Sequence, residues 1–441
     1  MDKDKEYILK LANENRVKFI RLWFTDILGF LKSFAITIDE LEDALIEGVR
    51  FDGSTLQGFI RRDESEMIAL PDTSTFQVLP WRPKEDSVAR MFCDIYKNDM
   101  TPYEGDSRYI LKKILRKASD DGYSFYTGPE IEFFFFKNSG APEILDRGGY
   151  YDLTPLDVAT DYRRQTVLTL EKMGIGVISS HHEGAYSQHE IDLRHEDALT
   201  MADNIMTFRL ITKEIGQSNG IYASFMPKPM AGQNGSGMHV HQSLFRDEEN
   251  IFFDANEESY LSKEGRCYIA GLLKHSRDFF AITNQWINSY KRLLHGFEAP
   301  THISWSTRCD TSLIRVPECK PDKPRTMRVE LRNPDPACNP YLAFAVVLAS
   351  GLKGMKERYE LPPPLDSTQN ISCRSDFQKM GLEPLPTQLG EALIDLGKSE
   401  LMRETLGARL VDNFIENKML ELDRFNSHIT DYEINEYLPI L

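Results

Sequence analysis

Runs in which apolar and polar residues alternate predict a small sheet in the first hundred residues. The runs are rich in β-branched and aromatic residues, as is typical of strands, and they cover 17–24, 31–38, 75–81 and 87–96. Asp26 and Gly29 lie between the first two runs, so this pair predicts a β-hairpin. Residues 41–48 predict a short acidic helix that ends at Gly48.

The pattern changes near Pro102, which we interpret as a linker, and longer helical periods then alternate with strands. Helices are predicted at 107–118, 161–173 and 198–218, and strands at 123–137, 221–227 and 237–245. Near the end, Leu406, Leu410 and Phe414 recur at helical spacing, so residues 389–425 predict an amphipathic helical pair. Mixed helices and strands of this kind favour an α+β or α/β catalytic domain.

Charge and composition narrow the class of protein. The 441 residues include 52 Lys+Arg and 68 Asp+Glu, a net charge of −16, which argues against a nucleic-acid partner. The sequence has no apolar run long enough for a membrane span and no secretory signal after Met1. Its six cysteines form no CxxC pair, so we expect reduced thiols and a cytoplasmic protein.

The first chemical signal is a strand with two carboxylates. Residues 128–136 read GPEIEFFFF, and side chains two apart in a strand share a face, so Glu130 and Glu132 point the same way. An edge strand with a solvated acidic face is one interpretation. The four phenylalanines favour a buried strand instead, in which a bound cation relieves the repulsion between the carboxylates.

Three further clusters offer related ligands. Residues 181–192 contain histidines and carboxylates, 234–243 place His239 and His241 on one strand face after a glycine-rich turn, and 328–332 alternate arginines with Glu330. Each alone fits a polar loop or a salt-bridge ladder. Together, carboxylates with an occasional imidazole favour Mg²⁺ or Mn²⁺ over zinc, and the arginines favour phosphate and carboxylate substrates. No P-loop or Rossmann motif occurs.

These clusters, in this order, resemble the glutamine synthetase family of type I. The matching motifs cover nearly the whole chain and include 51–54 (FDGS), 128–132 (GPEIE), 181–183 (HHE), 188–190 (QHE), 234–239 (NGSGMH), 288–292 (NSYKR), 298–300 (EAP) and 339–342 (NPYL). The resemblance implies an α+β fold, with a small β-grasp domain at 1–102 and a large catalytic domain at 103–441. In the latter, an antiparallel-rich sheet surrounded by helices forms a metal-lined funnel. It also implies a dodecamer of two stacked hexamers with active sites between subunits.

The implied activity is an ATP-dependent ligase of nitrogen metabolism, which makes L-glutamine from L-glutamate and ammonia through γ-glutamyl phosphate. Two or three Mg²⁺ or Mn²⁺ ions per site are implied. The residue roles carried over by the resemblance are metal ligands (Glu130, Glu132, Glu183, Glu190, His239, Glu330), substrate contacts (Glu132, Asn234, Gly235, Arg292, Glu298, Arg332), ATP contacts (His241, Ser243, Arg315, Arg328) and catalytic groups (Asp52, Glu298, Arg315). Arg61 falls where the family places an arginine linked to glutamine feedback.

One departure from the family pattern concerns the phosphate. Asp310 stands where the family usually has an arginine that faces the phosphate, so the charge at this position is reversed. At an effective dielectric constant of about 20 and a distance of about 5 Å, the interaction of each unit of charge with the phosphate is worth roughly 3 kcal/mol. Changes also occur near the amine pocket, for example at Gly184 and Tyr186. Three interpretations therefore stay open: an ordinary glutamine synthetase, a paralogue that ligates glutamate to an alkylamine or polyamine, and a weakly active or inactive scaffold or sensor.

Overall fold

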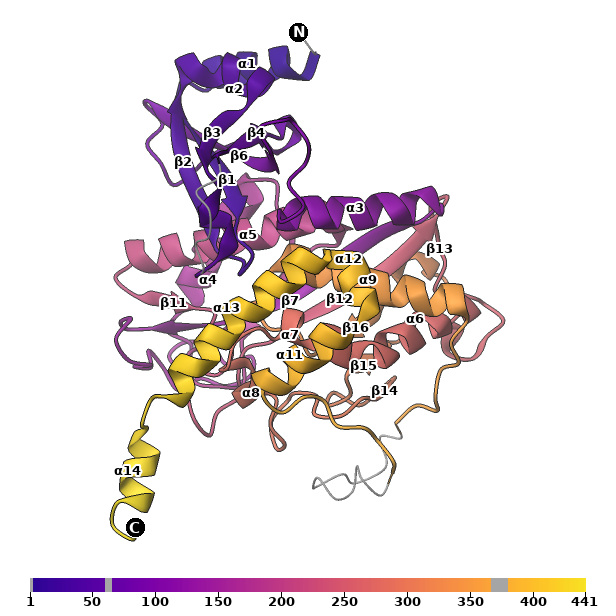
Figure 1. Ribbon diagram of the computed structural model, residues 1–441. Coiled ribbons are helices and arrows are strands. Elements are labelled where there is room, and N and C mark those ends of the chain that lie inside the picture. Colours follow the sequence, from indigo (N-terminus) through magenta and orange to yellow (C-terminus); the bar gives the residue numbers. More distant parts are fainter. Residues whose placement is uncertain (1–2, 60–65, 366–379) are drawn as a thin grey trace.

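The computed structural model describes residues 3–59, 66–365 and 380–441 (Figure 1). Among these, a first sheet of six strands has the order β2-β1-β6-β4-β3, with β5 paired to β6. Its strands are β1 (Val17–Thr25), β2 (Leu31–Thr37), β3 (Val49–Asp52), β4 (Glu66–Pro71), β5 (Gln77–Val78) and β6 (Ser87–Tyr96). Only β1 and β6 are parallel neighbours. Helices α1 (Lys3–Glu14) and α2 (Leu41–Glu47) pack their apolar faces on this sheet.

The second sheet carries the acidic motifs. Its described part has ten strands, and the main path has the order β14-β15-β16-β12-β7-β9-β8. The strands on this path are β7 (Ser124–Phe136), β8 (Val177–His182), β9 (Gln188–Leu193), β12 (Met238–Arg246), β14 (Trp305–Ser306), β15 (Ile314–Arg315) and β16 (Val329–Leu331). Short strands flank it: β10 (Glu196–Asp197), β11 (Tyr222–Ser224) and β13 (Glu249–Asn250). All its pairs are antiparallel except β14 with β15, as the resemblance implied for an antiparallel-rich sheet.

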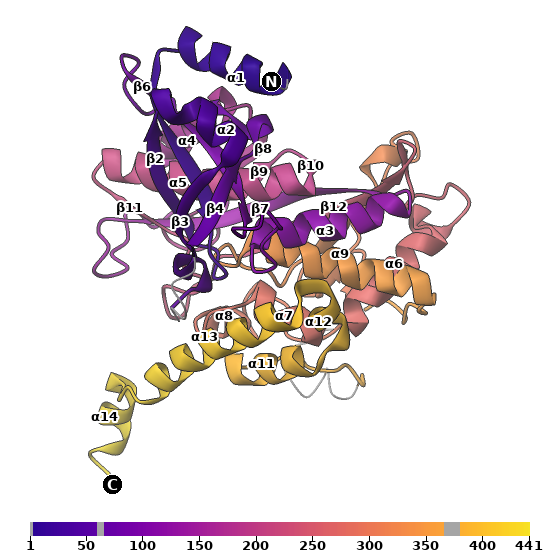
Figure 2. The ribbon, with the colours of Figure 1, turned by 45° about the horizontal axis from the view of Figure 1, so that its top comes forward.

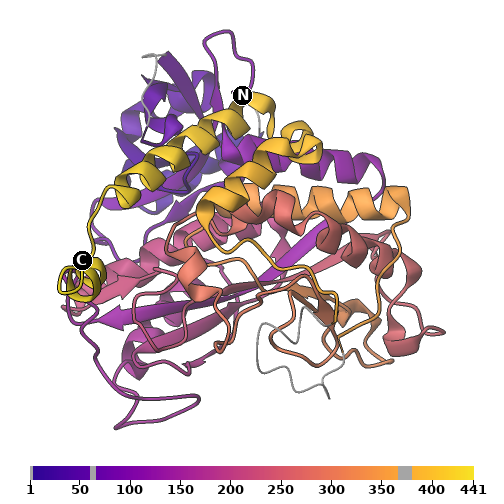
Figure 3. The ribbon, with the colours of Figure 1, turned by 60° about the horizontal axis from the view of Figure 1, so that its bottom comes forward.

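Helices cover the large sheet and extend beyond it. They are α3 (Ser107–Asp120), α4 (Thr160–Lys172), α5 (Ala198–Ser218), α6 (Lys263–Lys274), α7 (Ser276–Thr283), α8 (Ser289–Arg292), α9 (Pro340–Glu357), α11 (Leu389–Lys398), α12 (Glu400–Leu406), α13 (Ala408–Asn426) and α14 (Asp431–Tyr437). Single 3₁₀ turns occur at Ile38–Glu40, Gly53–Gln57, Thr73–Thr75, Glu258–Tyr260 and Pro324–Thr326. The long strands lie beside these helices in Figure 3, and α14 projects from the body in Figures 1 and 2. Within the described ranges, no helix has both the length and the apolar character needed to cross a bilayer.

Most of the predicted elements are confirmed within a few residues, including the hairpin, the strand over 123–137 and the helices after Pro102. Three predictions are wrong in extent. The strand predicted over 75–81 pairs only at Gln77–Val78, and the one predicted over 221–227 pairs only at Tyr222–Ser224. The predicted helical pair over 389–425 is three helices, because Ser399 caps α12 and Gly407, with φ of +88°, separates α12 from α13.

Several elements gave no usable pattern in the sequence. The helices α1 and α6 to α9 and the strand β4 were not predicted. α9 shows why, because most of its residues are buried, with apolar side chains around its whole circumference. A helix enclosed on all sides has no polar stripe, and its amphipathic period is therefore lost.

Strand β7 shows how the large sheet separates its core from its polar face. Ile131, Phe133 and Phe135 are buried in the main core under the helices, whereas Glu130 and Glu132 alternate with them on the other face. Further along that polar face, Phe134 and Phe136 form a small separate cluster with Ala185. The phenylalanines therefore bury the strand from both sides, and the two carboxylates occupy a gap in this apolar cover.

Arg108 in α3 joins the small sheet to α5. Its guanidinium donates to Asp72 (2.8 Å), which follows β4, to Asp94 of β6 (2.6 Å), and to Asp203 of α5 (3.0 and 3.1 Å). Burial alone would raise the pKa of Asp72, but the charge of Arg108 lowers it to about 2. The Arg108 side chain is only 4% exposed. Lys112 also contacts Asp72 and Asp94, so it is the buried Asp203 that depends on Arg108 for its counter-charge.

We expect Arg108→Met to destabilise the fold strongly, because it leaves Asp203 buried without its cation. The expected loss is about 3–5 kcal/mol in the free energy of unfolding, measured as a shift in the denaturant midpoint. Arg266→Met is the matched control, since Arg266 pairs with Glu257 at a half-exposed position and should cost less than about 1 kcal/mol. Equal losses in the two variants would contradict the role assigned to Arg108.

Candidate active site

A cavity of about 840 Å³ opens over the polar face of the large sheet. Most residues of the acidic motifs line it: seven carboxylates and two arginines contribute to its wall. The carboxylates are Glu130, Glu132, Glu183, Glu190, Asp192, Glu298 and Asp310, and the arginines are Arg315 and Arg332. This imbalance marks the cavity as a site for cations.

Strand register places the acidic and imidazole side chains opposite one another. Glu132 of β7 pairs with Glu190 of β9, and Glu130 of β7 pairs with His239 of β12. On the other side of β12, His241 pairs with Glu330 of β16. Like charges directly across a strand pair are destabilising, so the Glu132–Glu190 pair has to be compensated by positive charge.

The first metal-capable group consists of Glu130, His239 and Glu330, whose ligand atoms lie within 4.8 Å of one another. Glu130 also contacts His239 Nδ1 (3.2 Å) and His241 Nε2 (2.7 Å). Although burial alone raises the pKa of Glu130, the two imidazoles lower it well below its ordinary value. Glu330 accepts hydrogen bonds from Arg315 Nε (2.5 Å) and from Arg332, so it is held as a carboxylate.

The second group consists of His181, Glu183 and Glu190, also within 4.8 Å, and Glu132 lies beside it. Glu132 accepts hydrogen bonds from Gln188 Nε2 (2.9 Å) and Gly237 N (3.0 Å). Burial and the neighbouring Glu183 charge raise the pKa of Glu132 to about 8. Burial also raises the pKa of Glu190, together with its neighbours Asp192 and Glu132. Without a bound cation, Glu132 and Glu190 therefore favour their protonated forms.

These donor sets fit a hard divalent cation. The ligands are carboxylate oxygens with single imidazoles, which Mg²⁺ and Mn²⁺ accept. His239 Nε2 is buried and has no hydrogen-bond partner among the described residues, although it lies 3.8 Å from Glu132 Oε1. A buried imidazole nitrogen facing crowded carboxylates is what a cation-binding position requires.

Other residues predicted for the site also reach the cavity. Asn234, Gly235, Glu298, Arg315 and Arg332 line it. Tyr150 and Tyr151 line it too, and sequence reasoning missed both. Tyr150 donates a hydrogen bond to Glu298 Oε2 (2.5 Å). The only available signal was the Gly148-Gly149 pair before them, which permits a close approach of the chain.

Several predicted residues lie behind or away from the cavity wall. Arg292 is buried and donates to the main-chain oxygens of residues 332, 333 and 334. Ser243 donates to Met327 O, and Arg328 Nε donates to His241 Nδ1. Asp52 belongs to the small sheet, where it accepts hydrogen bonds from Ser54. Arg61 lies outside the described residues.

Asp310 is half of an ion pair at the cavity rim. Its Oδ1 lies 3.2 Å from Arg315 NH1, and its side chain is 66% exposed. The same arginine reaches Glu330 through Nε. Asp310 therefore draws Arg315, a predicted phosphate contact, toward a carboxylate.

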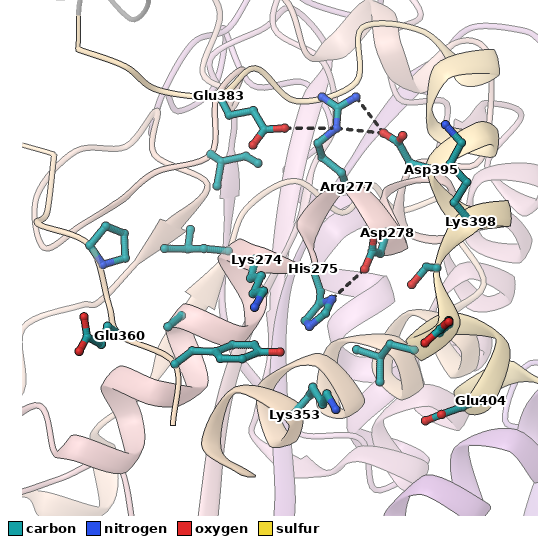
Figure 4. Close-up of a pocket in the computed structure, with 18 residues that line it drawn as sticks. Lys274, His275, Arg277, Asp278, Lys353, Glu360, Glu383, Asp395, Lys398 and Glu404 are labelled. Carbon is teal, nitrogen blue, oxygen red and sulfur yellow. Dashed lines mark hydrogen bonds and ion pairs between the residues drawn. The ribbon is translucent and has the colours of Figure 1, made fainter. Parts of the chain in front are cut away.

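A second cavity, of about 910 Å³, lies among α6, α7, α9, α11 and α12 (Figure 4). Its charges are largely satisfied within the chain: Arg277 pairs with Glu383 and Asp395, and His275 pairs with Asp278. Lys274 lies over the ring of Tyr359, with Nζ 3.8 Å from the ring centroid. None of the metal-capable groups found among the described residues falls here, so we assign the chemistry to the first cavity.

Comparisons with known proteins agree with this assignment. The family profile "Glutamine synthetase, catalytic domain" matches residues 104–437, and "Glutamine synthetase, beta-Grasp domain" matches residues 16–98. Relatives named glutamine synthetase include those of Mycolicibacterium smegmatis, 49% identical over all of both chains, and of Methanosarcina mazei, 47% identical over 99% of this chain and 98% of the relative.

Solved structures are also similar. A chain titled "GmaS/ADP complex" is 27% identical, with a TM-score of 0.88, over 98% of this chain and 99% of that one. A glutamine synthetase of Plasmodium falciparum, 24% identical with a TM-score of 0.90 over 99% of both chains, supports the fold.

The raised pKa of Glu132 predicts a pH dependence for the metal-free protein. Its pKa, about 8 in the folded state, lies above the ordinary value of 4.5, so its stabilisation is complete below pH 4.5 and is lost as pH rises toward 8. Glu132→Gln stays neutral, so at pH 8 in EDTA it should exceed the wild type in stability by about 1–3 kcal/mol, with a smaller difference at pH 5. Thermal unfolding at both pH values measures this.

Glu143→Gln is the control, because Glu143 is an exposed carboxylate paired with Lys137. A Glu132→Gln curve that follows the wild type at both pH values would contradict the protonation of Glu132 in the folded protein.

Proposed function

The chain belongs to the glutamine synthetase family, and we propose that its cavity converts L-glutamate, ammonia and ATP to L-glutamine through γ-glutamyl phosphate. It is a carbon–nitrogen ligase that releases ADP and phosphate. The observation that carries the proposal is the pair of metal-capable groups, Glu130–His239–Glu330 and His181–Glu183–Glu190, in one cavity. We also propose 1–102 and 103–441 as its two domains.

The metal positions follow from these groups. We propose that Glu130, His239 and Glu330 hold the ion on the nucleotide side, and that Glu132, Glu183 and Glu190 hold the ion near glutamate. Bound Mg²⁺ or Mn²⁺, two or three per site, supplies positive charge for the phosphoryl group and the substrate carboxylate. The raised pKa values of Glu132 and Glu190 support this assignment, because a bound cation replaces the proton on each of these carboxyls.

Substrate contacts are assigned by access to the cavity. Asn234, Gly235 and Arg332 line it, and we propose that they orient glutamate. We propose that Arg292 also contributes to glutamate binding from behind the wall, where it braces Arg332 by donating to its carbonyl oxygen at 3.0 Å. On the nucleotide side we propose His241, Ser243, Arg315 and Arg328.

Proton transfers need groups near the amine. Glu298 lies at the rim, where Tyr150 holds it, and we propose that it closes the site and takes a proton from the reaction intermediate. We propose that Asp52 of a neighbouring subunit takes a proton from ammonium, in a dodecamer of two hexamers. Within one chain Asp52 belongs to the small sheet, which supports a role in completing another subunit's site.

We propose a cytoplasmic location, which the free thiols of the five described cysteines support.

A larger amine is the second candidate substrate. Asp310 places a carboxylate at the cavity rim, and a carboxylate there suits a cationic amine. Ammonia remains the main proposal, because the relatives of highest identity reported above carry the name glutamine synthetase over their full length.

Phosphate release from ATP tests the proposed reaction directly. We expect release that requires glutamate, ammonium and Mg²⁺ or Mn²⁺ together, and Glu183→Gln should reduce it at least about 100-fold by weakening the metal site. Release with methylamine or spermidine but not with ammonium would instead support the second candidate. Intact ATP binding with no release in the presence of any amine would leave a scaffold or sensor.

Asp310 should limit the use of ATP, because it pairs with the arginine assigned to phosphate. Asp310→Arg restores the family charge, and we expect kcat/KM for ATP to rise about tenfold or more, equivalent to about 1.4 kcal/mol or more of transition-state stabilisation. Asp310→Asn, which releases Arg315 without adding charge, should lie between Asp310→Arg and the wild type. Unchanged kinetics in both variants would show that the ion pair has no catalytic effect.

A further inference from the structure

A loop over residues 147–157, between β7 and α4, is closed at its neck by one buried carboxylate. Asp146 directly precedes the loop, and its Oδ2 accepts a hydrogen bond from the amide of Val158, which directly follows the loop (3.1 Å). Its Oδ1 contacts His182 Nε2 (3.0 Å) and the amide of Ser187 (3.0 Å). Asp146 therefore joins both ends of the loop to the β8–β9 hairpin.

Ser187 completes this connection from the hairpin side. Its hydroxyl oxygen accepts hydrogen bonds from the amides of Leu145 (2.7 Å) and Asp146 (3.1 Å). Its carbonyl oxygen accepts from Phe135 N of β7 (3.0 Å), and its φ of +60° marks a constrained turn. The loop, the hairpin and the central strand thus meet at Asp146 and Ser187.

The joined parts both face the active-site cavity. The tip of the loop carries Tyr150, which donates to Glu298, and Tyr151, whose ring centroid lies 4.8 Å from that of His181. The hairpin carries Glu183, whose main-chain oxygen lies 2.7 Å from His182 Nδ1. One chain of hydrogen bonds therefore runs from the Asp146 carboxylate through an imidazole to the peptide of a proposed metal ligand.

Asp146, His182 and His189 also lie close enough to hold a metal of their own, but the hydrogen bonds argue against it. Arg163 NH1 lies 3.0 Å from His189 Nδ1, and an arginine can only donate. Nδ1 is then the acceptor, so Nε2 carries the proton and offers no lone pair to an ion. His182 contacts oxygen acceptors through both ring nitrogens, and both contacts are hydrogen bonds only when both nitrogens carry protons, a form that has no free lone pair either.

We propose that Asp146 is a positioning residue for the metal site: it sets the hairpin that presents Glu183 and Glu190 and connects it to the tyrosine loop at the rim. This inference rests on the proposed metal site. Groups behind metal ligands typically affect metal affinity about 10- to 100-fold. The loss of Asp146 should therefore weaken metal binding more than its effect on overall stability explains.

The test measures Mn²⁺ binding to the full-length protein by calorimetry and by metal-induced thermal shift, both without substrates. Asp146→Asn should raise the Mn²⁺ dissociation constant about tenfold or more, because one of its two acceptor oxygens becomes an amide donor. Asp106→Asn is the matched control. Asp106 is also buried and accepts hydrogen bonds from two backbone amides (3.0 Å each), but it caps the start of α3. That control should lose stability while its Mn²⁺ binding stays within about twofold of wild type.

A second variant removes the connection from the other side. Ser187→Gly tolerates the positive φ but removes the hydroxyl, and it should weaken Mn²⁺ binding in the same direction. Because the two residues act in one network, the double variant should lose less affinity than the sum of the two single losses. This arm keeps the test decisive if Asp146→Asn does not fold.

The outcomes separate this inference from the proposed function. If Glu183→Gln leaves wild-type Mn²⁺ binding unchanged, the metal site itself is wrong, and the role of Asp146 is wrong with it. If Glu183→Gln abolishes binding while Asp146→Asn and Ser187→Gly behave like Asp106→Asn, the metal site stands and only the positioning role is overturned.

Discussion

Repulsion between buried carboxylates is the constraint on which the active site depends. The register of β7, β9, β12 and β16 places glutamates and histidines beside one another, and register is strongly specified because the opposite face of the sheet is apolar. A slip of one residue would move Glu130 and Glu132 into the core. Packing on one face therefore enforces an arrangement of charge on the other that the chain does not neutralise by itself.

Buried carboxylates elsewhere in the chain show the contrast. Arg108 and Lys112 supply the cations for the aspartates between the small sheet and α5, and Arg163 supplies it for Asp157. Glu132 and Glu190 have neighbouring carboxylates instead, and their pKa values rise accordingly. Where the chain supplies the cation, the ion pair holds the structure together. Where it does not, the carboxylates are available for a cation that comes with the reaction.

Asp310 pairs with a cation of the cavity wall, and in doing so it reduces the positive charge that this cation offers to substrates. At the cavity rim it adds a carboxylate to a wall that already carries an excess of them, and it pairs with Arg315, which also supports Glu330. Arg315 thus pairs with two carboxylates at once, Asp310 at the rim and the proposed metal ligand Glu330. The effect of this double pairing on kcat/KM for ATP depends on the balance of charge across the whole cavity, to which all its ions and side chains contribute.

The sequence by itself determined the elements with a clear period and the candidate ligands spaced two apart, because strand geometry puts such residues on one face. It did not reveal α9, whose all-apolar pattern has no period, or Tyr150, which reaches Glu298 from 148 residues away. Only the tertiary structure decided that Arg292 lies behind the cavity wall, that Arg315 pairs with Asp310 and that Asp146 joins a loop to a hairpin. These contacts join segments whose sequence patterns are independent, so only the packing of the core brings them together.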